Sequence, residues 1–183
     1  MAGAEVIALD EPVDYWDHGG WADRFSSRRF TTRQNDYANS FQKSTVYTPQ
    51  MIVDGQTQFV GSDEDAARQP KARISLARTG DTILVRVDHL PSSAKNDPAE
   101  VVLAITKSGL RSSVGGGENA GRLGHSAAVR QFTPLGVVSG GIFTASPTVR
   151  PASGWRRENL SVVVFVQERG SRRIVGAAEM GLR

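Results

Sequence analysis

The stretch ARISLARTGDTILVRVDHL, residues 72–90, alternates apolar and polar residues on both sides of a Thr-Gly-Asp turn. In its second half Ile83, Val85 and Val87 fall on one face of an extended chain, and the first half has the same spacing. Successive side chains of a strand point to opposite faces, so this alternation predicts an antiparallel hairpin with one buried face.

Apolar segments separated by Gly, Pro and Ser continue to the end of the chain. They are AEVVLAITKSG (99–109), SAAVRQFTPLGVVSGGIFT (126–144), LSVVVFVQERG (160–170) and RRIVGAAEM (172–180). Short strands with turn residues at such intervals favour an antiparallel β-sandwich over a parallel sheet, here across residues 71–183. The Gly-rich stretch 114–124 lacks the spacing of a phosphate-binding motif and is interpreted as a loop.

Residues 1–70 carry both helix and strand signals. Serines open the stretch 26–42, in which Phe30, Tyr37 and Phe41 share one helical face, so a helix with an apolar stripe is predicted there. Three further elements are expected: a buried strand at 5–10, a hairpin at 51–61 that turns at Asp54-Gly55, and a short helix at 62–69.

The composition limits both chemistry and location. The chain has 183 residues, a formal net charge of +3 and no cysteine, which excludes disulfides, thiolate nucleophiles and Cys-ligated metals. No apolar run is long enough to cross a bilayer, and the opening MAGAEVIALDEP lacks the features of a signal peptide. A cytoplasmic location is therefore expected if Met1 is the native start.

Charge is divided unevenly along the chain. Residues 1–70 hold 6 basic and 11 acidic side chains, whereas residues 71–183 hold 16 basic and 8 acidic ones. The basic residues are scattered rather than gathered in one tract, so a solvated surface explains them better than a nucleic-acid interface. We expect no nucleic acid as a partner.

The dipeptide Thr48-Pro49 stands at the entry of the predicted 51–61 hairpin. Proline cannot donate a hydrogen bond to a sheet, so it belongs at an edge, at the first residue of a strand or at a bend. The order Thr-Pro, hairpin, helix is that of thioredoxin-like folds, in which a cis peptide bond precedes the hairpin.

The runs VDYWDHGGWADRFSSRRFTTRQNDYA (13–38) and VYTPQMIVDG (46–55) resemble domain-of-unknown-function family 1223, which consists of secreted, thioredoxin-like bacterial proteins. Shorter runs further on, VRQFTPLG, VVVFVQ and RRIVGAAE among them, extend the likeness over nearly the whole chain. The residues that carry the resemblance are Asp14, Tyr15, Trp16, Asp17, Gly20, Trp21, Asp23, Phe25, Arg33, Gln34, Tyr37, Tyr47, Thr48, Pro49, Gln50 and Gly55.

The resemblance implies an α+β fold, with a partial thioredoxin-like α/β module at 1–70 and an antiparallel β-sandwich at 71–183. In the family a signal peptide, a first strand and a CxxC helix precede the aromatic run, and this chain begins after them. The resemblance thus implies that this chain is N-terminally truncated. Its expected function is that of a non-catalytic remnant or fragment that binds a protein or peptide. The alternative is a truncated thiol-disulfide oxidoreductase of the bacterial cell envelope, periplasmic or secreted as the resemblance implies.

Two loops are the candidate binding site, one from Tyr47 to Gln50 and one that contains the tryptophans. A peptide would contact Tyr47, Thr48, Pro49, Gln50, Trp16, Trp21 and Asp14. The alternative for Pro49 is an architectural role, in which it shapes the loop. The alternative for the tryptophans is that they cover the edge of a core while Asp14 or Asp17 caps backbone donors.

Other site chemistries find less support. Asp14, Asp17, His18 and Asp23 offer oxygen and imidazole donors, but their spacing matches no known metal motif, so no metal is predicted. His125 has Ser126 beside it in the sequence but no identified acid, so no catalytic triad is predicted. We expect no catalytic residue and no cofactor in this chain.

Overall fold

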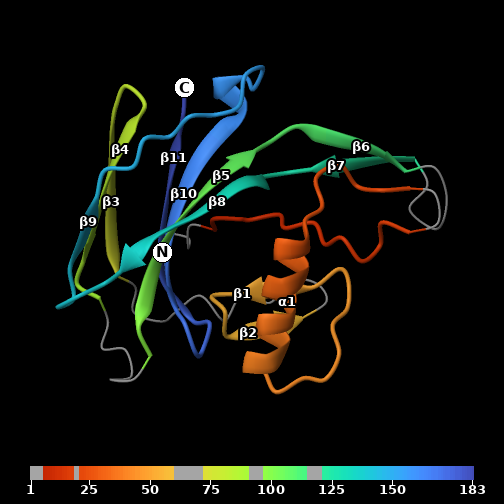
Figure 1. Cartoon of the computed structure of the whole chain (residues 1–183), viewed down its shortest axis with the longest axis horizontal. Helices are drawn as coiled ribbons and strands as arrows, with labels where there is room; N and C mark the ends of the chain where they lie inside the picture. The colour runs from red at the N-terminus through yellow and green to blue at the C-terminus, as the bar shows by residue number, and fades with distance from the viewer. Residues whose placement is uncertain (1–5, 19–20, 60–71, 91–96, 115–120) are drawn as a thin grey trace, which may run out of the picture.

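Two antiparallel sheets dominate the computed structural model (Figure 1), which describes residues 6–18, 21–59, 72–90, 97–114 and 121–183. The larger sheet has four strands in the order β11-β10-β5-β8, and the smaller has the order β3-β4-β9. The larger comprises β5 (Ala99–Lys107), β8 (Ala128–Val137), β10 (Leu160–Glu168) and β11 (Ile174–Gly181), and the smaller β3 (Arg73–Thr79), β4 (Thr82–Asp88) and β9 (Phe143–Ala145).

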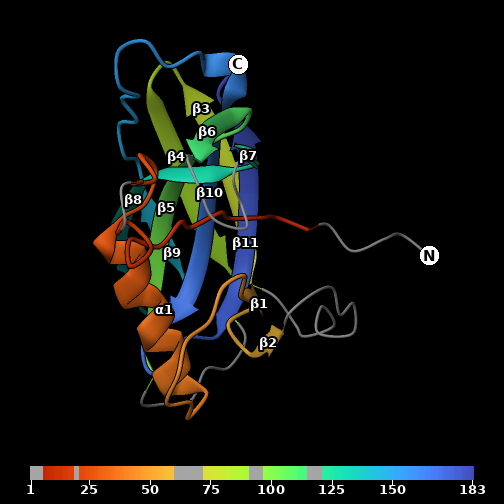
Figure 2. The same cartoon turned by 90° about the vertical axis from the view of Figure 1, so that its right-hand side faces the viewer.

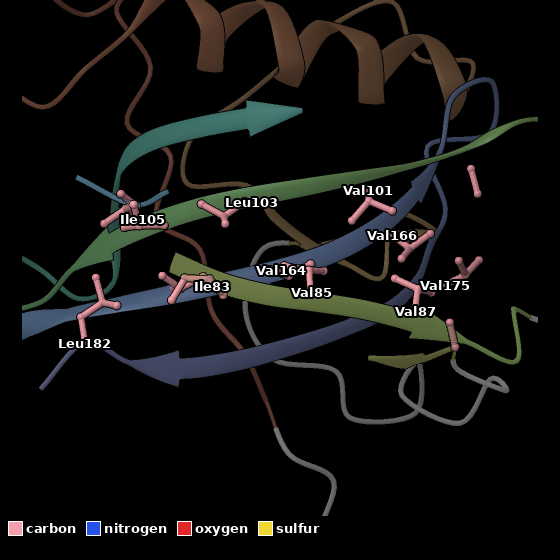
Figure 3. Close-up of a cluster of buried hydrophobic side chains, with 14 of the residues drawn as sticks. Ile83, Val85, Val87, Val101, Leu103, Ile105, Val164, Val166, Val175 and Leu182 are labelled. Carbon is pink, nitrogen blue, oxygen red and sulfur yellow. The ribbon is translucent and has the colours of Figure 1, made fainter. Parts of the chain in front are cut away.

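The main core lies between these two sheets (Figure 3). Alternate residues of β5 and β10, such as Val101 and Val164, point toward Ile83 and Val85 of β4, and all four are fully buried. The predicted antiparallel hairpin in residues 72–90 is confirmed, because β3 pairs with β4 through a turn at Gly80 and the alternate apolar residues of β4 face the core.

The opposite face of the four-stranded sheet is also buried. There Val102, Val163 and Phe165 pack against Phe30 of helix α1 (Arg28–Ser40), which lies beside this sheet in both views (Figures 1 and 2). Because both faces of β5 and β10 are covered, these strands read as continuous apolar runs rather than as alternating ones.

The predicted α+β fold with a partial thioredoxin-like α/β module is wrong. The described residues form mainly antiparallel strands and a single α-helix, and that helix packs on the sheet built by the second half of the chain. The strands β1 (Met51–Val53) and β2 (Thr57–Phe59) form a two-stranded sheet of their own instead of joining a central α/β sheet.

Several local predictions are confirmed. Helix α1 falls within 26–42, and the side chain of its N-cap residue Ser27 accepts a hydrogen bond from the Arg29 amide. Strands β1 and β2 pair around a turn in which Asp54 and Gly55 both have positive φ. The helix in the described residues is too short and too polar to cross a membrane.

Two other local predictions differ from the structure. Residues 6–9 form no strand, and Asp10 makes only an isolated parallel bridge with Ala128. Within the stretch 114–124, interpreted as a loop, β7 (Gly121–His125) pairs with β6 (Leu110–Val114) and extends the β5–β8 ribbon outward (Figure 1). The helix expected at 62–69 lies outside the described residues.

The β1–β2 turn docks on the connection between β10 and β11. The amide of Ile174 donates to the carbonyl of Asp54 at 2.6 Å. A Cβ atom on Gly55 would lie 1.9 Å from the carbonyl oxygen of Arg172. Glycine is required here for its positive φ and for this close backbone approach.

The substitution Gly55→Ala therefore destabilises the protein more than Gly80→Ala. Both glycines have positive φ, but nothing lies within 4 Å of a Cβ on Gly80, so the second variant carries only the backbone cost, about 1–2 kcal/mol. Overpacking against Arg172 adds about 1–3 kcal/mol to the first. Urea denaturation of both variants measures the difference, and equal losses would contradict the docking.

The β10–β11 connection is itself held by Asp97. Its carboxylate accepts hydrogen bonds from the amides of Gly170 at 2.6 Å and Ser171 at 2.8 Å. Burial by itself would raise the pKa of Asp97, but these hydrogen bonds outweigh it and hold the pKa below its ordinary value.

The stability that Asp97 contributes is present above its unfolded pKa and is lost as pH falls through the lower folded pKa. Asp97→Asn is expected to lower the free energy of unfolding by about 1 kcal/mol at pH 7. The gap to the parent protein closes as the pH falls below about 4. Asp81→Asn, which removes an exposed partner of Arg157, is the control and changes little. A gap that persists at pH 2 argues against this role.

Candidate functional site

The aromatic loop before α1 is held by its own carboxylates. Asp14 accepts a hydrogen bond from the Thr31 hydroxyl at 2.5 Å, while its amide donates to the same oxygen at 3.1 Å. Asp17 accepts from the amide of Asp23 at 2.9 Å and from the hydroxyl of Ser26 at 2.5 Å. The carboxylates that sequence analysis weighed as metal donors are thus used to fix the loop on the start of the helix.

Trp16 and the Thr48-Pro49 loop lie together although 32 residues separate them. The indole Nε1 of Trp16 donates to the hydroxyl of Thr48 at 2.9 Å, and 60% of Trp16 remains exposed. Thr48 and Pro49 are also exposed, and the peptide bond between them is cis. The next large exposed apolar residue along the chain is Met51, at 52%. We call Trp16, Thr48, Pro49 and Met51 the Trp16–Thr48 surface.

Gln34 of α1 supports this surface from behind. Its amide nitrogen donates to the carbonyl of Tyr47 and to Oε1 of Gln50, both at 2.9 Å. Its own Oε1 accepts from the phenol of Tyr15 at 3.1 Å, and Gln50 donates onward to Gln58 of β2. One helical side chain therefore sets the positions of both loops.

The neighbouring residue Arg33 is buried and fixes α1 on the sheet. Its guanidinium donates to Gln167 of β10 at 2.6 Å, to the phenol oxygen of Tyr37 at 2.9 Å and to Glu11 at 3.2 Å. Burial raises the pKa of the Glu11 carboxyl and the Arg33 charge opposes this rise, while burial likewise raises the pKa of Tyr37. This network explains why Arg33, Gln34 and Tyr37 accompany the loop motifs in the sequence.

The side chains of Trp21 and Asp14, two of the predicted binding residues, contact other parts of the chain. The indole of Trp21 donates to the carbonyl of Ser113 at 2.6 Å, which ties the aromatic loop to β6. Asp14 faces Thr31. The structure therefore brings together Tyr47, Thr48, Pro49, Gln50 and Trp16.

A second polar cluster centres on His125 at the end of β7. Its Nε2 lies 3.1 Å from the Ser112 hydroxyl and 3.7 Å from Asp23, and its Nδ1 lies 2.9 Å from Asp10. The Ser112 hydroxyl donates to Asp23 at 3.1 Å. The sequence contains no signal for this cluster, because Asp10 is 115 residues and Ser112 is 13 residues from His125 and no local motif connects them.

The Ser112–His125–Asp10 chain has the connectivity of a hydrolytic triad but not its accessibility. Ser112 is only 6% exposed, and its hydroxyl lies 3.1 Å from Asp23 as well as 3.1 Å from the imidazole, so its one hydrogen is shared between two acceptors. The cluster joins the N-terminal segment, the aromatic loop and the β6–β7 hairpin, and no buried side-chain nitrogen or oxygen among the described residues lacks a partner. We assign it a structural role.

Ser112 is accordingly expected to resist a fluorophosphonate reagent. Ser112→Ala should lower the free energy of unfolding by about 1–3 kcal/mol because it leaves buried polar atoms unpaired. Ser126→Ala changes the exposed serine beside His125 and is the control, with little effect on stability. Mass spectrometry of the treated protein and urea denaturation check both points. Covalent labelling of Ser112 would contradict the structural role and support a hydrolytic one.

Comparison with known proteins places these features in a family. A search of curated proteins found no match. Among solved structures the chain is similar to the protein AGR_C_4864 from Agrobacterium tumefaciens, with a TM-score of 0.75 and 23% identity over 96% of this chain and 80% of that one. It also resembles HBP35 of Porphyromonas gingivalis, with a TM-score of 0.57 and 14% identity over 84% of this chain and 58% of that one. Since the model of the family described as protein of unknown function (DUF1223) matches residues 1–167, the chain belongs to that family.

Proposed function

We propose that this chain is a non-catalytic binding module that holds an extended peptide segment of a partner protein on the Trp16–Thr48 surface. The observation that carries the proposal is the state of Trp16, which is exposed over 60% of its area and yet fixed by its hydrogen bond to Thr48. A large aromatic side chain held in place offers contact area without losing conformational freedom on binding.

The strand that follows the Thr48-Pro49 loop, β1, has a backbone that suits an extended ligand. Among the described strands β1 pairs only with β2, so its other edge has backbone groups to offer. Peptides commonly bind by adding a strand to such an edge, with side-chain contacts giving specificity. Trp16, Pro49 and Met51 would provide those contacts.

Thiol chemistry has no place in this proposal. The chain contains no cysteine, so it cannot exchange disulfides with a bound peptide. The hydrogen bonds from Gln34 to the Tyr47 carbonyl and to Gln50 hold the loop in the shape that a peptide recognises. A peptide would bind and dissociate reversibly.

Selection from a displayed library of random linear peptides, followed by amide NMR titration of the chain with the selected peptides, tests the proposal. We expect shifts at residues 16 and 47–53. Trp16→Ala should weaken binding at least tenfold, because a buried aromatic contact at an interface is worth about 2 kcal/mol or more.

Ile142→Ala is the matched control, since Ile142 is 55% exposed on a different part of the chain and its loss should leave affinity unchanged. Thr48→Val removes the hydroxyl that orients the indole and should give a smaller loss than Trp16→Ala. Peptides that bind elsewhere, or that bind the Trp16→Ala variant equally well, would refute the proposal.

A further inference from the structure

A cleft lined by basic residues lies between the start of α1 and β8, and it shares no residue with the Trp16–Thr48 surface. It consists of two adjoining cavities of about 280 and 160 Å³ that share Arg24, Phe25 and Arg130. The smaller is also lined by Lys107 and Trp155. We call these five residues the cationic cleft. None of them belongs to the proposed peptide site.

Aromatic rings position the basic groups of the cleft. The guanidinium carbons of Arg24 and Arg130 lie 4.6 and 4.7 Å from the centroid of the same ring, Phe25, which is buried. Arg130 also lies 5.5 Å from the ring of Trp155, and the Lys107 ammonium lies 5.7 Å from that ring. Three cations are therefore gathered around two aromatic side chains.

These cations lack the partners that other basic residues have. Arg86, Arg157, Arg169 and Arg173 each form an ion pair with a carboxylate. In the described part of the chain Arg24, Lys107 and Arg130 form no salt bridge and donate no side-chain hydrogen bond.

The Asp23 carboxylate attracts Arg130 and offsets part of the positive charge, although it forms no salt bridge with Arg130 and accepts its hydrogen bonds from Ser112 and the Phe25 amide. Burial lowers the pKa of Arg130, and repulsion from Arg24 lowers it further. One neighbouring carboxylate against three cations leaves net positive charge in the cleft among the described residues.

We propose that the cationic cleft binds a small phosphate-bearing molecule, with its oxygens between Arg24, Arg130 and Lys107. Guanidinium groups match phosphate oxygens in geometry and bind them through paired hydrogen bonds. A dianionic phosphate compensates three converging cations better than a single carboxylate does. The cavity volume admits a small molecule, and the partly exposed ring of Trp155 would contact its apolar part.

Isothermal titration of the full chain at constant ionic strength tests this inference with inorganic phosphate, phenyl phosphate and succinate. Inorganic phosphate against phenyl phosphate distinguishes a site for the free ion from one for a phosphate ester, and either fits the proposal. Succinate binding without phosphate binding would overturn it.

The double variant Arg24→Gln with Arg130→Gln should weaken phosphate binding at least tenfold. Arg157→Gln with Arg169→Gln removes the same charge outside the cleft and should change affinity less than twofold. Equal weakening by both pairs would mean nonspecific charge attraction and would refute the site, as would phosphate binding no stronger than that of chloride. Arg24→Gln alone, at an exposed residue, still tests the site if Arg130→Gln prevents folding.

Discussion

Burial of both faces of strands β5 and β10 is the constraint on which the rest of the structure depends. One face packs against β4 to form the main core, and the other receives Phe30 of α1. At the end of β10 the outer face turns polar, and there Gln167 meets Arg33 and the Tyr37 phenol. The apolar contact of Phe30 and the hydrogen bonds of Arg33 and Tyr37 hold α1 against the sheet at two separate points. Two points of contact fix both the position of the helix on the sheet and its angle to the strands.

The loops inherit their geometry from that helix. Arg33 binds Gln167 of β10, and the next residue, Gln34, donates a hydrogen bond to the Tyr47 carbonyl. The position of the Thr48-Pro49 loop relative to the sheet is therefore set by two adjacent residues of α1. At the N-terminal end of the helix, Asp14 and Asp17 fix the aromatic loop, and Trp21 ties it to β6. The residues by which the family resemblance is recognised are thus largely the ones that hold loops on a sheet. Few of them are free to contact a ligand, and Trp16 is the clearest exception.

Polar side chains are used differently in different parts of the molecule. Around His125 and around Arg33 the buried side-chain nitrogens and oxygens of the described residues all have partners, and such networks stabilise one arrangement of the segments they join. In the cationic cleft the basic groups lie over aromatic rings and form no salt bridge with a described carboxylate. Paired networks point to architecture, and unpaired groups of like charge that converge on a cavity point to binding. This contrast separates the residues we assign to the fold from those we assign to recognition.

The sequence by itself determined the elements whose signals are local. Ser27 and the spacing of Phe30 and Tyr37 predicted the helix, Gly55 and Gly80 predicted two turns, and the motif residues predicted the family. The tertiary structure alone decided which sheet the helix covers. The prediction of a thioredoxin-like module was wrong because α1 packs on the sheet formed by the second half of the chain.

An apolar stripe on a helix shows that the helix packs against something, but it does not show which surface it packs on, because any apolar face can cover it. The His125 cluster and the cationic cleft were not predictable for a similar reason. Asp10 and Ser112 contact His125, and Arg24 and Arg130 lie over the ring of Phe25. These contacts join residues that are distant in the chain, and the spacing of residues in the sequence contains no signal for them.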